Sequence, residues 1–302
     1  MPAERTAARS LRAALCLPLF CILSGTGLPA AQATAQSPGA LTPEQGRTPV
    51  NQALVDRALA NELRAAKDTG HPMRYVLRKI TPRLTATKEI FETKDGAVAR
   101  LVSVNGQPLT AADEQKEQAR LDALLADPDL QRRRRQAEIT DTGRALKVLR
   151  VLPRAFLYRY AGSSDGAGGK VEKFTFIPNP DFTPPDLETE VLTEMSGAIW
   201  IDAAQQRVTR LEGHLDQNVD FGWGALGRLN KGGWIAIDQA DVGGNQWHTV
   251  RFQMAMTGRI FFRSRVFDTT EEETQFTPAP PGVSYAQAIE MLQGETGPGA
   301  GR

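Results

Sequence analysis

The sequence predicts an α+β protein that is mainly β, with a strongly curved antiparallel sheet and helices packed against it. Strand-like segments follow one another from Met195 to Val242, and Gly, Asp, Gln and Asn lie between them, which is typical of hairpins. Three more such segments lie at Met73–Ile80, Ala86–Thr93 and Ala97–Val104. An amphipathic helical pattern begins at Val50 and ends before Gly70, and its apolar side needs a sheet to cover.

The stretch from Met195 to Val242 is the part around which the rest of the chain is arranged. Its first strand contains the run Ala-Ile-Trp-Ile at positions 198–201, which is apolar at successive positions. A strand of this kind is covered on both faces, so we expect it near the centre of the sheet and not at an edge.

The first 33 residues have the pattern of a cleavable signal peptide. Arg5, Arg9 and Arg12 precede the apolar run Ala13–Leu23, and Ala31-Gln32-Ala33 offers a small-residue cleavage site. The apolar run is too short to span a bilayer, so we expect no membrane helix in the mature chain. Residues 34–49 then form a linker rich in Pro, Gly and Thr.

The first 33 residues also predict the cellular compartment of the protein. Cys16 and Cys21, the two cysteines of the chain, both lie among them, so the mature chain would have no disulfide and no thiolate ligand. Export without disulfides is typical of a bacterial periplasm. Removal of residues 1–33 changes the formal net charge from +1 to about −1. A nearly neutral protein is not expected to bind nucleic acid.

A helical insertion is expected between strands at 110–152. Thr110 and Asp113 resemble a capping box that begins a helix ending near Ala126. After Asp127-Pro128 we expect a second helix at Asp129–Thr142 and a third at Gly143–Leu152.

The remaining strands and the tail complete the domain, which we expect to cover residues 50–277. Strands are predicted at Ala155–Tyr160 and Lys170–Ile177, joined by a flexible Gly/Ser loop, and at Trp234–Val242 and Trp247–Arg265. Residues 278–302 are expected to form a Pro/Gly-rich tail with a short helix at Ser284–Gln293.

Catalytic and metal-binding motifs are weak in this sequence. His71, His214 and His248 are scattered without ligand spacing, so no metal or other cofactor is predicted. No Gly-x-Ser-x-Gly elbow and no P-loop occurs, so no catalytic residue is proposed. The glycines of Phe221–Gly227 lie in a strand pattern, where they favour sheet curvature over close packing of another element on the backbone. Arg132–Arg135 is interpreted as a solvated helix face, with anionic lipid headgroups as the alternative.

Nine aromatic and methionine residues form the candidate binding site. Its members lie in strands of the expected sheet and could line one concave groove for a flexible hydrophobic ligand: Phe174, Phe176, Trp200, Phe221, Trp223, Phe252, Met254, Met256 and Phe262. The alternative is that these residues are the ordinary core beneath the helices.

The order of elements and the hairpin Gly197–Leu211, with its Gly-Ala-Ile-Trp-Ile-Asp and Arg-Val-Thr-Arg-Leu segments, resemble the LolA-like family of periplasmic lipoprotein carriers and envelope sigma-factor regulatory proteins. The resemblance implies an incomplete barrel with helices on its concave face and an apolar cavity for acyl chains. It covers Val50–Phe276 in layout, whereas the insertion from Thr110 to Leu152 is longer than the family pattern.

The hypothesis that these patterns favour is an exported, non-enzymatic protein that binds a lipid, a lipoprotein acyl chain or a similar apolar ligand. One alternative is an envelope sensor or assembly module that acts through contacts with another protein. The other is a hydrolase whose site the sequence does not display.

The signal-peptide interpretation predicts that the exported protein begins near residue 34. Intact-mass measurement of the exported protein checks this, because loss of residues 1–33 has a defined mass. A retained Met1–Ala33 segment, or a lipid attached to Cys16 or Cys21, would contradict the interpretation.

Overall fold

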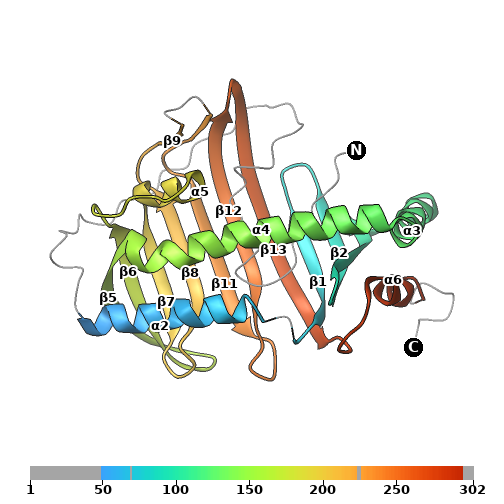
Figure 1. Cartoon of the computed structure of the whole chain (residues 1–302), viewed down its shortest axis with the longest axis horizontal. Helices are drawn as coiled ribbons and strands as arrows, with labels where there is room; N and C mark the ends of the chain where they lie inside the picture. The colour runs from blue at the N-terminus through green and yellow to red at the C-terminus, as the bar shows by residue number, and fades with distance from the viewer. Residues whose placement is uncertain (1–48, 69, 223–225, 295–302) are drawn as a thin grey trace.

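The protein, described by a computed structural model over residues 49–68, 70–222 and 226–294, is built on one open antiparallel sheet. The sheet has 13 strands, and its main path runs β4-β3-β2-β1-β13-β12-β11-β8-β7-β6-β5, with β10 and β9 attached beside β12. Figure 1 shows the sheet twisting and curving from one end to the other. The expected mainly β, curved antiparallel architecture is therefore confirmed. The expected signal peptide, Trp223 and the end of the tail lie outside the described residues.

The strands have the following bounds: β1 Met73–Ile80, β2 Thr85–Thr93, β3 Gly96–Val104, β4 Gln107–Pro108, β5 Phe156–Gly166, β6 Gly169–Pro178, β7 Met195–Asp202, β8 Arg207–Leu215, β9 Val219–Phe221, β10 Gly227–Leu229, β11 Trp234–Asp241, β12 Trp247–Ile260 and β13 Arg263–Pro278. The helices are α2 Pro49–Ala65, α3 Ala111–Ala126, α4 Pro128–Ala155, α5 Leu187–Glu190, the 3₁₀ helix η3 Val191–Glu194 and α6 Tyr285–Gly294. The strand that contains Trp200, β7, lies between β6 and β8 and is not an edge strand, as expected. It is, however, the third strand from the β5 edge and does not lie near the centre of the sheet.

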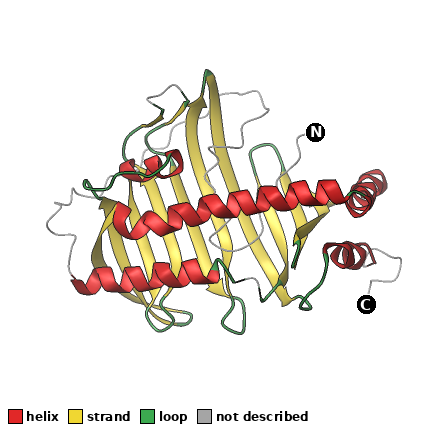
Figure 2. Cartoon of the chain, viewed as in Figure 1, coloured by secondary structure: helices red, strands yellow, loops and turns green. Residues whose placement is uncertain are grey.

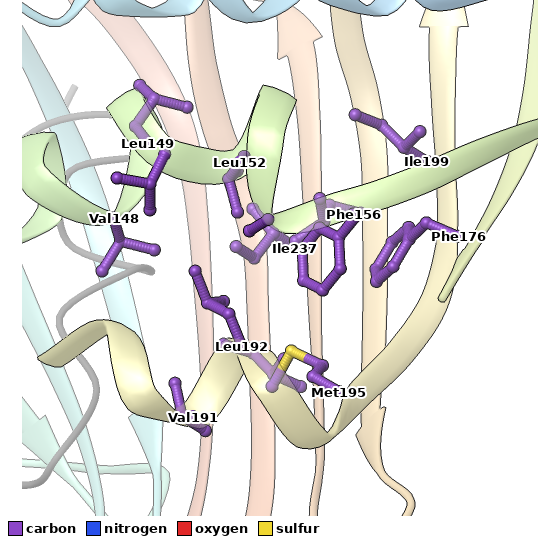
Figure 3. Packing of buried hydrophobic residues seen from close by; sticks show 14 of the residues in the cluster. Val148, Leu149, Leu152, Phe156, Phe176, Val191, Leu192, Met195, Ile199 and Ile237 are labelled. Atoms are coloured by element: carbon purple, nitrogen blue, oxygen red, sulfur yellow. The ribbon is translucent and has the colours of Figure 1, made fainter. Parts of the chain in front are cut away.

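Two helices cover one face of the sheet from β5 to β12. Helices α2 and α4 lie side by side across these strands (Figure 2). Val55 and Leu59 of α2 and Leu149 of α4 are fully or almost fully buried in a core cluster shared with β5–β8, β11 and β12. Figure 3 shows Leu152 of α4 next to Ile237 of β11. The apolar stripes of two helices therefore bury the apolar face of the sheet.

A second core lies on the opposite face of the other end of the sheet. Phe91 of β2 and Val98 of β3 pack against α3 and α6, with Leu121 and Ile289 fully buried between them. The strand register places Phe91 and Val98 on the face opposite to that of Phe252 in β12. A third buried cluster, on β1 to β3, lies on the same face as the first core. The β1–β3 end of the sheet is thus buried on both faces.

The expected break between two helices at Gly143 is wrong. Helix α4 runs without interruption from Pro128 to Ala155, which is 28 residues. Asp127 caps it, since its side chain accepts a hydrogen bond from the backbone N–H of Leu130 at 2.9 Å. A glycine inside a helix costs only about 1 kcal/mol, which the burial of the C-terminal half of α4 easily offsets.

Two hairpins also differ from expectation. The Gly/Ser segment expected as a flexible loop continues the β5–β6 ladder, whose last pair is Gly166 with Gly169. The single strand expected at Trp247–Arg265 turns at Phe261 and Phe262 and returns as the 16-residue strand β13. Alternation alone gives no sign of this turn, because it contains neither glycine nor proline.

One glycine of the Phe221–Gly227 segment, Gly227, lies where two strands approach closely. Gly227 belongs to β10, which pairs with β12, and a Cβ atom at Gly227 would lie 2.8 Å from the carbonyl oxygen of Arg259. A Cβ at Gly258 would lie 2.3 Å from the carbonyl oxygen of Arg228. These glycines therefore permit close approach of two strands, which was the less favoured of the two interpretations.

A buried carboxylate fixes α2 to the sheet. Glu62 of α2, whose side chain is 1% exposed, accepts two hydrogen bonds from Arg207, from Nε at 2.7 Å and from Nη2 at 3.0 Å. It also accepts from the backbone N–H of Val208 at 3.0 Å and from Nε2 of Gln239 at 3.3 Å. One side chain thus binds α2 to β8 and β11 by bidentate, charge-assisted bonds.

Glu62→Ala is expected to lower the free energy of unfolding by about 3–5 kcal/mol, because it leaves the guanidinium of Arg207 buried without its counter-ion. Chemical denaturation measures this. The matched control is Glu272→Ala, which removes the partly exposed ion pair with Arg78 at 3.0 Å and is expected to cost about 0–1 kcal/mol. An equal loss of unfolding free energy in the two variants would show that Glu62 does not fix α2 to the sheet.

Candidate functional site

An open cleft of about 870 Å³ lies where the N-terminal part of α2 meets the C-terminal end of α4. Its third wall is the proline-rich segment that follows β6. The residues that line it come from these three parts of the chain: Gln52, Asp56, Pro153, Arg154, Phe156, Asn179, Asp181, Phe182, Thr183 and Pro185. The volume is within the range of about 300–1,000 Å³ that is usual for small-molecule sites.

Backbone hydrogen bonds hold the proline-rich wall in place. The N–H of Asn179 donates to the carbonyl of Ala155 at 2.8 Å, and its side-chain Nδ2 donates to the carbonyl of Arg154 at 2.8 Å. The carbonyl of Asn179 in turn accepts from the N–H of Phe182 at 3.0 Å. On the opposite wall, Nε2 of Gln52 donates to the carbonyl of Pro153 at 3.2 Å and so joins α2 to α4. The three walls are therefore linked to one another.

The cleft has an apolar inner side and a polar rim. Phe156 forms part of the inner side, and its ring centroid is 4.4 Å from that of Phe176 (Figure 3). Phe182 packs on the edge of the same core cluster. At the rim, Asp56, Arg154 and Asp181 are exposed. The cleft is thus continuous with the apolar core and carries charges of both signs at its mouth.

A buried tyrosine supports the inner side of the cleft. The hydroxyl of Tyr158 donates to the carbonyl of Leu152 at 3.0 Å, close to the C-terminal end of α4. Burial, with a smaller contribution from the negative charge of Asp56, raises the pKa of Tyr158 above its ordinary value. The ring stays neutral at physiological pH and acts as a spacer between α4 and the sheet.

Six of the nine residues expected in an apolar groove lie together, and they are packed inside the first core. Their exposure ranges from 2% to 7%, and all belong to the cluster beneath α2 and α4: Phe174, Phe176, Phe221, Phe252, Met254 and Met256. Phe176 lies next to the cleft through its contact with Phe156.

The other three residues lie elsewhere. Trp200 is half-buried on the opposite face of β7, with Nζ of Lys173 at 4.7 Å and the Arg210 guanidinium carbon at 5.8 Å from its ring centroid. Phe262 is 96% exposed at the turn between β12 and β13. Trp223 is outside the described residues. Trp200 and Phe262 therefore do not share a surface with the six buried residues.

Sequence reasoning did not select the residues of the cleft. The proline-rich segment 178–185 was evident as a stiff crossing between strands, and it supplies five of the lining residues. The other walls come from helix ends that lie about 100 positions apart in the chain, such as Gln52 and Pro153, which are separated by 101. No local pattern connects such positions.

One serine, one histidine and one aspartate lie together on β7 and β8, but they lack the geometry of a catalytic triad. Oγ of Ser196 lies 3.0 Å from Nε2 of His214, and Oδ1 of Asp216 lies 3.1 Å from the same nitrogen. A triad needs the carboxylate on the other ring nitrogen, so that the imidazole can accept the serine proton. This trio therefore does not support the hydrolase alternative.

The described residues contain no group of three or more His, Cys, Asp or Glu side chains placed to hold a metal ion. Among the same residues, no helix is both long enough and apolar enough to cross a membrane.

Comparison with known proteins gives matches in structure alone. No protein-family profile matches the sequence, and no curated protein sequence matches it. A domain provisionally described as an outer membrane lipoprotein-sorting protein, from Vibrio parahaemolyticus, is similar at 11% identity and a TM-score of 0.30, over 79% of this chain and 98% of that one. A LolA superfamily protein from Nitrosomonas europaea is similar at 8% identity and a TM-score of 0.27, over 76% and 94%.

A buried carboxylate lies outside the cleft, where β12 and β13 separate. Glu273 of β13 is 6% exposed, and its Oε2 atom has no hydrogen-bond partner among the described residues. Burial, followed by the charges of Glu271 and Glu92, raises the pKa of Glu273 well above its ordinary value of 4.5. The folded protein therefore holds a proton there that the unfolded chain loses at lower pH.

The raised pKa predicts how stability depends on pH. Below pH of about 4.5 the carboxyl of Glu273 is protonated in both states, and its contribution to stability is fully present. As the pH rises through the folded-state pKa, the contribution is lost. Glu273→Gln, which imitates the protonated form, should become more stable than the natural protein in alkaline solution. Denaturant titrations across the pH range check this, and parallel curves for the two proteins would contradict it.

Proposed function

We propose that the protein is an exported, non-enzymatic binding protein of the cell envelope, and that its ligand is a lipid or acyl chain with a polar end. The observation that carries the proposal is the cleft at the joined ends of α2 and α4, with an apolar inner side and a charged rim. An amphipathic ligand has the same division, with a chain to bury and a head that stays in water.

The proposed ligand lies with its chain against Phe156 and Phe182 and its head near the rim. Phe176 backs Phe156 at 4.4 Å, so the inner side is supported by the core and does not collapse when the ligand leaves. The carboxylates of Asp56 and Asp181 and the guanidinium of Arg154 would face the polar end. Packing of the six buried aromatic and methionine residues supports this placement over a groove across the sheet face.

The proposal that the protein is not an enzyme rests on the chemistry of the residues that line the cleft. The cleft holds no histidine or cysteine among its lining residues. Its carboxylates lie on the exposed rim, where solvent screens them from one another. Binding without bond cleavage is the chemistry that these groups favour. The export signal in residues 1–33 and the LolA-like hairpin support the same envelope setting.

The cleft predicts how a fluorescent fatty acid binds to two variants. Thr183→Trp adds an indole at an exposed lining position and is expected to weaken binding about tenfold by filling the space. Phe182→Ala removes part of the apolar surface and is expected to weaken binding by a similar factor, since burial of a large apolar side chain contributes about 1.5–3 kcal/mol. Fluorescence titration measures both.

The control is Ile139→Ser, which replaces an apolar side chain that is 54% exposed on α4 and is not part of the cleft. This variant should bind the fatty acid as the natural protein does. If all three variants bind equally while remaining folded, the cleft is not the site. If the natural protein binds no fatty acid, the assignment of an apolar ligand is wrong.

A further inference from the structure

The β12–β13 hairpin projects beyond the rest of the sheet (Figure 1). The pairing of β1 with β13 ends at Ile80 and Thr270, so the seven residues Arg263–Thr269 of β13 have no β1 partner. On the other side, the pairing of β11 with β12 ends at Trp234 and Ala255. At about 3.3 Å per residue, the unpaired part of β13 is about 23 Å long. Among the strands of the described residues, the short β10, which pairs with β12, and its neighbour β9 accompany the projecting hairpin.

The apex of this hairpin is apolar and exposed. Phe262 is 96% exposed and Phe261 is 52% exposed. Leu226, 44% exposed, lies beside them, because its carbonyl accepts a hydrogen bond from the N–H of Phe261 at 3.0 Å. Phe261 has a φ of 49°, a left-handed conformation that glycine or asparagine adopts at lower cost. The backbone conformation of the turn therefore does not account for the presence of Phe261 and Phe262.

Arginines surround this apex on both faces of the hairpin. Arg263 and Arg265 lie opposite Ile260 and Gly258 in the register, on one face, and Arg259 lies on the other face opposite Arg228 of β10. Residues 218–230 and 256–269 contain these four arginines and two aspartates, Asp220 and Asp268, which gives this end a net charge of +2. Asp220 pairs with Arg228 at 2.6 Å. Arg259 faces the same carboxylate. The arginines outnumber the aspartates by two at this end of the hairpin.

We propose that this hairpin docks the protein on a bilayer surface that contains anionic lipids. Phe261 and Phe262 would enter the boundary between headgroups and acyl chains, and the arginines would contact the phosphates around them. Long arginine side chains can keep their charge at the level of the headgroups while the apex lies deeper.

The shape of the apex favours a bilayer over a protein partner. A stable protein interface buries about 800 Å² on each partner, which needs a broad surface. The projecting end is a two-stranded ribbon with a narrow apolar tip, and it fits a fluid surface that closes around it. The proposal does not depend on the ligand of the cleft, which lies between α2, α4 and the segment after β6.

The test is co-sedimentation of the purified protein with vesicles of phosphatidylcholine, with and without phosphatidylglycerol. The natural protein is expected to bind the mixed vesicles and to leave them when the salt concentration rises. Phe262→Ser should reduce the partition coefficient about tenfold, because a large apolar side chain no longer enters the boundary. Arg263→Glu combined with Arg265→Glu should reduce it by more than about tenfold and remove the preference for phosphatidylglycerol.

Ile139→Ser again serves as the control, since it removes an exposed apolar side chain far from the hairpin in sequence, on α4. It should leave the partition coefficient unchanged. A Phe262→Trp variant adds a second reading: on mixed vesicles its emission should shift further to the blue than that of the natural protein, which has four tryptophans of its own. The proposal is overturned if the natural protein stays in solution with both kinds of vesicle. It is equally overturned if Phe262→Ser binds as well as Ile139→Ser, or if the hairpin variants change the oligomeric state and not the binding to vesicles.

Discussion

Burial of one apolar face under α2 and α4 is the constraint on which the rest of the structure depends. An open sheet does not bury its own face, as a closed barrel does, so its apolar side chains need another layer. Here α2 and the C-terminal half of α4 supply that layer, and the carboxylate of Glu62 sets where α2 lies by binding Arg207 and the backbone of Val208. The helices, and not the strands, therefore decide which parts of the face stay accessible.

The cleft arises at the place where this cover ends. Helix α4 stops at Ala155 and passes directly into β5, and α2 begins beside this junction. The chain after β6 then crosses the helix ends to reach α5, and its prolines lack the N–H groups with which it could pair as a further strand. A filled core and an open space at its end are thus two results of the same arrangement. The β12–β13 hairpin contributes to this core through its lower part, whereas its exposed apex at Phe261 and Phe262 lies outside it.

Much of the fold is predictable from alternation and turn chemistry, whereas the site is not. Strands β1 to β3 and the β7–β8 hairpin follow from local patterns. Asp95-Gly96 marks the turn between β2 and β3, Asn105-Gly106 marks the end of β3, and a short polar segment separates β7 from β8. The turn at Phe261-Phe262 and the unbroken helix through Gly143 escape such patterns, since tertiary packing and exposure decide them. The apolar residues chosen from the strands include the true core, yet whether a core is filled depends on helix placement, which no local pattern records.

The length of α4 has a consequence for how the molecule unfolds. At about 1.5 Å per residue, its 28 residues make a rod of about 42 Å. Its C-terminal half belongs to the first core, and Leu130 near its beginning packs on the second core, on the opposite face of the sheet. Glu138 also accepts from the backbone N–H of Ala97 at 3.2 Å. The two cores share no face of the sheet, so this single helix makes them one cooperative unit, in which loosening at either end is felt at the other.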